Sequence, residues 1–246
     1  MKSPLFLLLI LLTASCQITE TLHLDSDGSG DIEFMYVRDE NSYMQIAREN
    51  YSKEDIFRDT TFVFSDYIKK YNETFSRNLE ADQKVFLKYS DVKVHIKESS
   101  YEKEFRTSYT QNFQKVSDIV DLSKTGRHLN VIKNNHALSA EGHFYNVSYN
   151  YAGNHFNRIV TITDSLKLKK VFDEVEERKA RYKGYKLVQN FILNYHFPRK
   201  IQSVSNPLAK ISEDHKSLSM QFHYYDCLQN PVSTNLEVLL EPEEVD

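Results

Sequence analysis

The sequence predicts an α+β fold, built on a mostly antiparallel sheet of about nine or ten strands that starts with an N-terminal β-hairpin, with a few amphipathic helices packed on one face. Apolar and polar residues alternate over many short segments, which is typical of antiparallel strands with one wet face. The helix-like segments fall into two groups rather than between successive strands, which argues against a doubly wound fold. The chain has 16 Tyr and 15 Phe but only 6 Gly and 5 Pro, which suits pleated surfaces.

The first two predicted strands form a β-hairpin around a glycine-rich turn. Residues 25–31 read Asp-Ser-Asp-Gly-Ser-Gly-Asp, and apolar residues alternate with polar ones on both sides of them. Two runs of period two around such a turn predict a hairpin. The alternating apolar positions are Ile18, Leu22, Leu24, Ile32, Phe34 and Tyr36.

Helical spacing of apolar residues predicts helices over 66–75, 79–89, 116–120 and 166–182. Ser65 and Ser165 directly precede the first and the last of these helices, so we expect their hydroxyls to cap the helix N-termini. Residues 38–60 are polar and are expected to be irregular, apart from a helical piece near 43–48. Residues 124–142 are also polar and predict a long loop.

Further alternating segments predict strands over 92–97, 105–111, 145–151, 158–162, 187–195, 218–224 and 236–240. The third and fourth of these segments flank Ala152-Gly153-Asn154 and predict a second hairpin. The chain has no internal repeat and no linker rich in Pro or Ser. We therefore expect a single domain over residues 16–240, followed by an acidic tail over 241–246.

Residues 1–15 predict a cleaved signal peptide. Lys2 precedes an apolar core at 5–12, and Ala14 and Ser15 are small residues at the expected cleavage site. The apolar core is too short to span a membrane, which needs roughly 20 apolar residues. With Cys16 the segment resembles a bacterial lipobox, which implies cleavage before Cys16 and a lipid on its thiol. The alternative is an ordinary cleaved signal followed by a chance cysteine.

Cysteine and charge content restrict the partners. If Cys16 carries a lipid, Cys227 has no partner for an internal disulfide, and we expect a half-buried structural thiol there. The formal net charge is −4, and the absence of a basic excess predicts no nucleic acid partner. We expect the membrane, reached through the lipid at Cys16, to be a partner.

The turn of the first hairpin also resembles the start of an EF-hand calcium loop. Asp25, Asp27 and Asp31 would supply oxygen ligands at alternate positions. The position of the bidentate glutamate is Tyr36, and the flanking residues alternate as strands do rather than as helices. A plain hairpin turn is therefore the favoured interpretation, with calcium binding as the alternative.

The sequence contains no recognisable metal-ligand or catalytic motif. Three histidines in a polar segment lack the close spacing of metal ligands: His128, His136 and His143. There is no G-x-S-x-G, no P-loop and no G-x-G-x-x-G, so we expect neither an enzyme nor a cofactor. A hydrolase would need converging polar groups, for which His196, Arg199 and Arg158 are the candidates.

Several stretches resemble a family of Bacteroidota outer-membrane lipoproteins of unknown function. The matching stretches are residues 16–24, Asp27-Gly28-Ser29-Gly30, 59–66, 195–201 and 204–206. A lipid-anchored hairpin with a D-G-x-G turn is also loosely similar to the LppM-type lipoprotein domain. That resemblance implies an α+β fold and an association with lipid or glycolipid binding, without implying any ligand residue here.

The expected function is that of a lipid-anchored envelope lipoprotein, a non-catalytic binding module for a hydrophobic ligand or a protein partner. The aromatic strands either enclose a cavity or only fill a core. The alternatives are a structural or assembly subunit of an outer-membrane complex, or a hydrolase acting on envelope polymers. Glu20 is the one acid just after Cys16, which favours the periplasmic face of the outer membrane over the cell surface.

Overall fold

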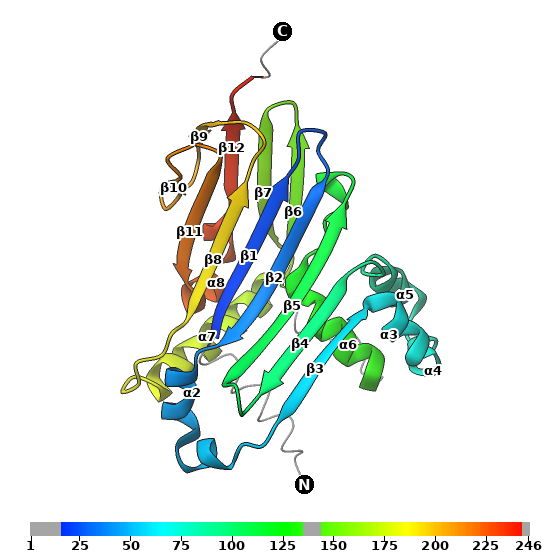
Figure 1. Cartoon of the computed structure of the whole chain (residues 1–246), viewed down its shortest axis with the longest axis vertical. Coiled ribbons are helices and arrows are strands. Elements are labelled where there is room, and N and C mark those ends of the chain that lie inside the picture. Colours follow the sequence, from blue (N-terminus) through cyan, green and yellow to red (C-terminus); the bar gives the residue numbers. More distant parts are fainter. Residues whose placement is uncertain (1–15, 135–143, 243–246) are drawn as a thin grey trace.

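The computed structural model describes residues 16–134 and 144–242 and confirms the predicted α+β class. The described residues form twelve strands, which divide into an eight-stranded and a four-stranded sheet instead of the expected nine or ten (Figure 1). The predicted signal peptide, residues 1–15, and residues 243–246 of the predicted acidic tail lie outside the described residues.

The N-terminal hairpin lies at the centre of the larger sheet. The strands of this sheet are, in spatial order, β10 (Lys210–Ile211), β11 (Ser217–His223), β8 (Asn190–His196), β1 (Cys16–Leu24), β2 (Gly30–Arg38), β5 (Glu104–Phe113), β4 (Lys93–Ser99) and β3 (Phe57–Val63). Every neighbouring pair is antiparallel except β1 and β8, which are parallel.

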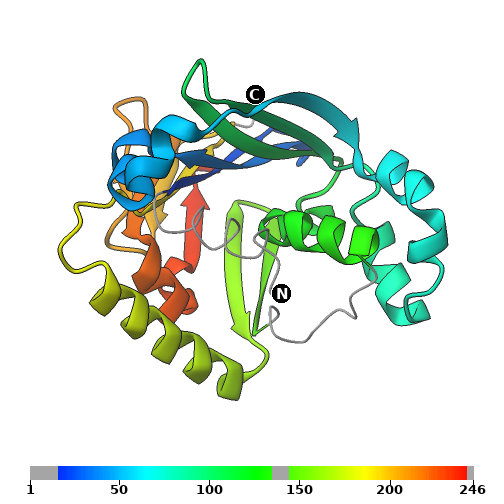
Figure 2. The same ribbon diagram turned by 90° about the horizontal axis from the view of Figure 1, so that it is seen from below.

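The smaller sheet contains the second predicted hairpin. Its order is β6 (Tyr145–Ala152), β7 (His155–Ile162), β12 (Leu236–Leu240) and β9 (Ile201–Val204), and all its pairs are antiparallel. Seen from below, the larger sheet arches over the smaller sheet (Figure 2). One cluster of buried apolar side chains joins the two sheets, and includes Leu22 and Leu193 from one and Phe156 and Val238 from the other.

Two glycines allow the turn of the first hairpin. Gly28 has φ 85°, a left-handed conformation that glycine adopts without the steric cost of a side chain. Gly30 has φ 157°, and a Cβ atom there would lie 2.0 Å from the carbonyl oxygen of His23. The turn is closed by the amide of Asp25, which donates to the carbonyl of Ser29 over 2.8 Å.

The described residues contain seven α-helices, most of them short. They are α2 (Glu40–Ala47), α3 (Phe64–Lys70), α4 (Asn72–Phe75), α5 (Glu80–Leu87), α6 (Thr125–Asn134), α7 (Ser165–Arg181) and α8 (Tyr224–Gln229). Helices α3 to α5 follow the edge strand β3, whereas α6 lies on the concave side of the larger sheet (Figure 2). Helix α7 packs beside α8, where Lys179 donates to Gln229 over 2.8 Å.

Two predicted helix starts were wrong. The helix expected over 66–75 begins at Phe64 and is divided into α3 and α4 at Tyr71, and its N-cap residue, Val63, makes no side-chain hydrogen bond. At α7 the cap is Asp164 rather than Ser165, because the Asp164 backbone is extended and its carboxylate accepts from the amide of Lys167 over 3.0 Å.

Two predicted irregular segments contain regular structure. Within 124–142, residues Thr125–Asn134 form α6. Its buried side mixes the polar Thr125 and His128 with the apolar Leu129 and Ile132, which hides the helical period. Residues 135–143 lie outside the described residues. Within 38–60, the edge strand β3 begins at Phe57, and its first five residues are exposed, so no alternation marks it. The predicted short helix near 116–120 is a single 3₁₀ turn.

Candidate functional site

A buried ion pair joins the two sheets. Glu20 of β1 and Arg158 of β7 are each 3% exposed. The Nε atom of Arg158 donates to Oε1 of Glu20 over 3.0 Å, and its Nη2 donates to Oε2 over 3.4 Å. A buried charge is tolerated only when it is paired and hydrogen-bonded, and this pair meets both conditions.

Three hydroxyl side chains complete this network. Tyr149 donates to Oε1 of Glu20 over 2.9 Å, and Tyr195 donates to the same oxygen. Arg158 donates through Nη1 to Oγ1 of Thr234 over 2.8 Å. Burial, together with the charge of Glu20, raises the pKa of Tyr149 and of Tyr195 well above the usual value for tyrosine.

The Glu20–Arg158 network keeps its arginine charged. Burial alone would lower the pKa of Arg158, but the charge of Glu20 opposes burial, and the pKa lies well above the usual value for arginine. Both carboxylate oxygens of Glu20 already accept hydrogen bonds from the protein. The network therefore acts as a clasp between the sheets rather than as an acid or base.

Next to this clasp, the phenol group of Tyr36 of β2 lies near the phenol groups of three tyrosines from other elements. They are Tyr109 of β5, Tyr145 of β6 and Tyr224 of α8, and we call the four residues the tyrosine cluster. The ring centroids of Tyr36 and Tyr109 are 6.3 Å apart in an edge-to-face arrangement. Burial and the neighbouring phenol groups of Tyr224, Tyr109 and Tyr145 raise the pKa of Tyr36 well above the usual value.

Tyr36 and Tyr145 of the tyrosine cluster differ from ordinary core residues. Tyr36 and Tyr145 are half-buried by surface area. Burial nevertheless raises the pKa of both phenol groups, although the nearby Arg158 acts in the opposite direction on Tyr145. Many protein atoms therefore surround each phenol group, while part of each side chain keeps accessible surface.

The concave face continues from the tyrosine cluster toward β3 with further half-buried aromatic residues. Phe62 of β3 stacks on Tyr67 of α3 with centroids 5.4 Å apart, and Tyr67 lies 4.6 Å from Tyr71. Burial, with a contribution from Tyr71, raises the pKa of Tyr67 to about 12. Ile96 of β4 is another half-buried apolar residue against the core.

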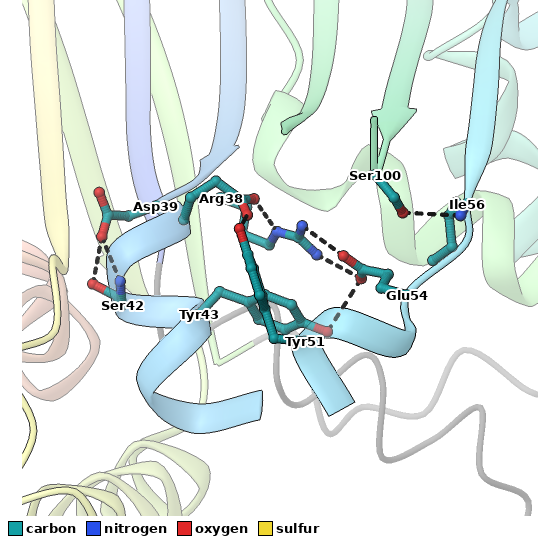
Figure 3. Close-up of polar contacts among 9 residues, drawn as sticks. Arg38, Asp39, Ser42, Tyr43, Tyr51, Glu54, Ile56 and Ser100 are labelled. Carbon is teal, nitrogen blue, oxygen red and sulfur yellow. Dashed lines mark hydrogen bonds and ion pairs between the residues drawn. The ribbon is translucent and has the colours of Figure 1, made fainter. Parts of the chain in front are cut away.

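The end of the sheet where β1 begins is closed by Arg38, which is in register with Cys16. Figure 3 shows Arg38 with its partner Glu54. The guanidinium of Arg38 lies between the rings of Tyr43 and Phe105, 3.9 and 3.2 Å from their centroids. It donates to Glu54 over 2.8 and 2.9 Å, and these bonds outweigh burial and raise the pKa of Arg38. The position of Cys16 is thus next to a well-ordered corner of the fold.

The predicted site residues of the first turn stabilise the turn itself. Asp27 accepts from the amide and the hydroxyl of Ser29 over 2.9 and 2.6 Å. Asp31 lies 3.2 Å from Nδ1 of His23, and Asp25 is 3.5 Å from the Ser29 hydroxyl. Among the described residues, no group of three His, Cys, Asp or Glu side chains could hold a metal ion.

Two further sequence candidates are structural. His128 packs edge-on against Phe86 and Tyr89 at 5.3 and 4.6 Å, whereas His136 and His143 lie outside the described residues. Cys227 is buried more completely than expected, at 7% exposure, and burial raises the pKa of its thiol to about 12. Such a thiol is a poor nucleophile at neutral pH.

The three residues considered for a hydrolase do not converge. Arg158 is in the buried clasp, and Arg199 donates to the hydroxyl of Tyr151 over 2.7 Å and to the carbonyl of Gly153 over 2.8 Å. His196 lies beside Ser217, 3.1 Å from its hydroxyl, on the opposite face of β8 from Tyr195.

The tyrosine cluster and the clasp could not be predicted from the sequence, because their members come from elements far apart in the chain. Tyr36, Tyr145 and Tyr149 all lie on strands that the sequence predicts, but alternation gives only the face of each residue. One signal was present: Glu20 is an acid at an inward position of β1, between Ile18 and Leu22. A charge at such a position requires a partner.

Fold and site together define an α+β domain with a charged clasp and an aromatic interior between two sheets. No known protein family and no curated protein matches the sequence. Among solved structures, the chain is similar to the NMR structure of the folded domain of Mycobacterium tuberculosis LppM, with 9% identity, a TM-score of 0.39, and coverage of 94% of this chain and 92% of that one.

These comparisons lend no support to the expected Bacteroidota affiliation. Across the described residues, none of the helices has the length and apolar character needed to cross a membrane.

Proposed function

We propose that this protein is a lipid-anchored, non-catalytic envelope lipoprotein that binds a hydrophobic ligand at the tyrosine cluster between its two sheets. The observation that carries the proposal is the state of Tyr36 and Tyr145, which keep accessible surface although burial is the largest cause that raises the pKa of each phenol group. Burial would contribute little to the pKa of a tyrosine whose ring lies at the outer surface. We therefore infer that the accessible part of each side chain faces the space between the sheets.

The chemistry of this region suits a ligand that is mainly apolar with a few polar groups. Ligand sites are typically lined by apolar and aromatic side chains with a small number of polar groups. The tyrosine cluster supplies ring faces together with hydroxyls, and the half-buried Phe62 and Ile96 extend the apolar surface along the sheet. An acyl chain or a ring system attached to a small polar group fits this description.

The proposed absence of catalysis is supported by what the charged groups do. Glu20 and Arg158, the ion pair of the clasp, are bonded to each other and to hydroxyl groups. Lys124, which donates to the carbonyl of Tyr145, forms an ion pair with Asp121 at 3.3 Å. His196 and Arg199, the other hydrolase candidates, are held elsewhere by their own contacts. No particular contact favours the assembly-subunit alternative, which stays a prediction.

The proposed anchor is Cys16, and it rests on the sequence before β1. Because β1 begins at Cys16 itself, a lipid there would hold the domain against the membrane with almost no tether. The outer membrane, and its periplasmic face, remain predictions from the sequence around Cys16.

Ligand binding is tested by native mass spectrometry of the full chain. The test compares an arginine introduced on the inner face of the larger sheet with one introduced on its outer face. Tyr36→Arg places a charge in the tyrosine cluster, and we expect co-purified lipid to be lost. Met35→Arg is the matched control, because the neighbouring residue on β2 faces the other side of the sheet. Absence of any adduct on the unmodified chain, or equal occupancy in the two variants, would contradict the proposal.

The anchor is tested separately by Cys16→Ser. We expect this variant to keep its full precursor mass, to gain no acyl groups, and to leave the membrane-anchored fraction. A mature, acylated Cys16→Ser chain would refute the anchor while leaving the ligand proposal intact. The two failures can therefore be told apart.

A further inference from the structure

A second region of the molecule, on the solvent-facing side of the larger sheet, forms an open pocket. It has a volume of about 420 Å³ and lies where β10 pairs with the edge of β11, next to β8 and β1. Its lining includes Thr21, Asn194, His196, Lys210 and Ser219. These side chains are on the opposite face of the sheet from Leu22, Leu193 and Tyr195, so the pocket is separate from the tyrosine cluster.

The lining of this pocket offers hydrogen-bond donors and one permanent positive charge. No carboxylate is among its lining residues. Lys210 makes no ion pair with any other residue in the described part of the chain, so its ammonium group is available. Asn194 accepts from the Ser219 hydroxyl through Oδ1 over 2.8 Å, which leaves its amide NH₂ to donate.

Two acidic residues near the pocket are already engaged, and a third, Glu33 of β2, is in register with Thr21 on the neighbouring strand. Asp214, in the β10–β11 turn, accepts from the Ser212 hydroxyl and from the amide of Lys216 over 2.5 and 2.9 Å. Asp31 is paired with His23, whose ring stacks on His196 at 4.5 Å. Among the residues that line the pocket, the permanently charged group is thus Lys210.

We propose that this pocket binds a small organic anion, with the phosphate or carboxylate held by Lys210, His196 and the amide of Asn194. A volume of about 420 Å³ is larger than a bare phosphate needs and lies in the range of small-molecule sites. The hydroxyls of Thr21 and Ser217, which also line the pocket, suit a hydroxylated body. A sugar acid or a polyol phosphate has this combination of groups.

The proposal includes a direction for the effect of pH. Burial, followed by the neighbouring His23, lowers the pKa of His196, so its ring is neutral at neutral pH; Asp214 and Asp31 oppose this weakly. A bound anion would favour the imidazolium form of His196. Binding should therefore become tighter as the pH falls through the range in which imidazole titrates.

The test is an NMR titration of the full chain with glucuronate, glycerol phosphate and inorganic phosphate, against neutral glucose and glycerol. We expect saturable shifts of the Asn194 side-chain amide and the His196 ring with the two organic anions, and at least tenfold weaker binding of the neutral compounds. Tighter binding of inorganic phosphate than of both organic anions would overturn the proposed ligand class. Equal binding of neutral and anionic compounds, or the absence of saturable shifts, would overturn the site.

Two lysine variants separate a direct contact from general charge. Lys210→Gln should weaken binding of the organic anions about fivefold to tenfold, because a charge-assisted hydrogen bond is lost. Lys216→Gln removes the same charge from the turn that follows β10, yet Lys216 does not line the pocket, so binding should change less than twofold. Equal effects of the two variants would contradict a site built around Lys210.

Discussion

The Glu20–Arg158 clasp shows how single residues hold the two sheets in one arrangement. Each charge loses its water on folding, and the pair, two tyrosine hydroxyls and Thr234 replace that water. Because each partner is buried on a different sheet, removal of one leaves the other charged and without its counter-ion. The cost of such a change exceeds the net contribution of the intact pair.

Arg158→Met should therefore lower the free energy of unfolding by about 3–5 kcal/mol, measured by urea denaturation. Arg77→Met removes an arginine from an exposed ion pair with Glu73 and should change the free energy of unfolding little. A similar small effect of both substitutions would show that the clasp does not hold the sheets together.

Cys227 provides a prediction about alkaline pH. The thiol ionises near 9.0 when unfolded and at about 12 in the folded protein, because burial disfavours the thiolate. The unfolded chain therefore releases this proton first, and the contribution of Cys227 to stability is lost as pH rises from about 9 toward 12.

Comparison of Cys227→Ala with the unchanged protein measures that contribution. The difference in unfolding free energy between the two should shift in favour of the variant as pH rises through that window. A difference that is independent of pH, or fast iodoacetamide labelling of the folded protein at neutral pH, would contradict the burial of the thiol.

At the scale of single elements, the sequence pattern predicted the strands and turns whose structure depends on residues that are neighbours in the chain. The β1–β2 hairpin is confirmed because alternation and the glycines at 28 and 30 specify both strands and the turn. Strand β3 was missed because edge exposure removes the alternation, and α6 was missed because the polar Thr125 and His128 interrupt the apolar pattern of its buried side. In both segments, contacts with parts of the chain far away in the sequence determine the secondary structure.

Gly30→Ala should lower the free energy of unfolding by at least about 2 kcal/mol, because the added methyl group meets the backbone of His23. Gly153→Ala, where φ is 64° and the surrounding space is open, should cost about 1 kcal/mol of strain. Gly184→Ala, with open space and no left-handed φ, should be close to neutral. Thermal unfolding of the three variants checks this order, and a mild Gly30→Ala would contradict the turn geometry.

At the scale of the whole molecule, the sequence predicted the fold class but neither the division into two sheets nor the site between them. The strands carrying Tyr36 and Tyr145 were both predicted, yet nothing local indicates that β2 and β6 face each other. The proposal of an aromatic binding space rather than a plain aromatic core rests on Tyr36 and Tyr145, which keep accessible surface although burial raises the pKa of both.

The whole-molecule arrangement also gives the proposed anchor a direction. Strand β1 runs from Cys16 at the Arg38 corner to Leu24, where the chain turns at the hairpin tip. With about 3.3 Å per residue, Thr21 and the outer pocket lie roughly 17 Å along the strand from Cys16. A lipid on Cys16 would therefore place the pocket away from the membrane surface and the Arg38 corner next to it.

The most direct test of the central claim is photo-crosslinking with a fatty acid that carries a diazirine on its acyl chain, followed by peptide mapping. Binding between the sheets predicts crosslinks concentrated on the inward residues of β2, β5, β6 and the start of α8, around Tyr36, Tyr109, Tyr145 and Tyr224. Tyr36→Arg should abolish these crosslinks and Met35→Arg should preserve them. Crosslinks confined to outward-facing residues such as Met35, or unchanged by Tyr36→Arg, would contradict a ligand site at the tyrosine cluster.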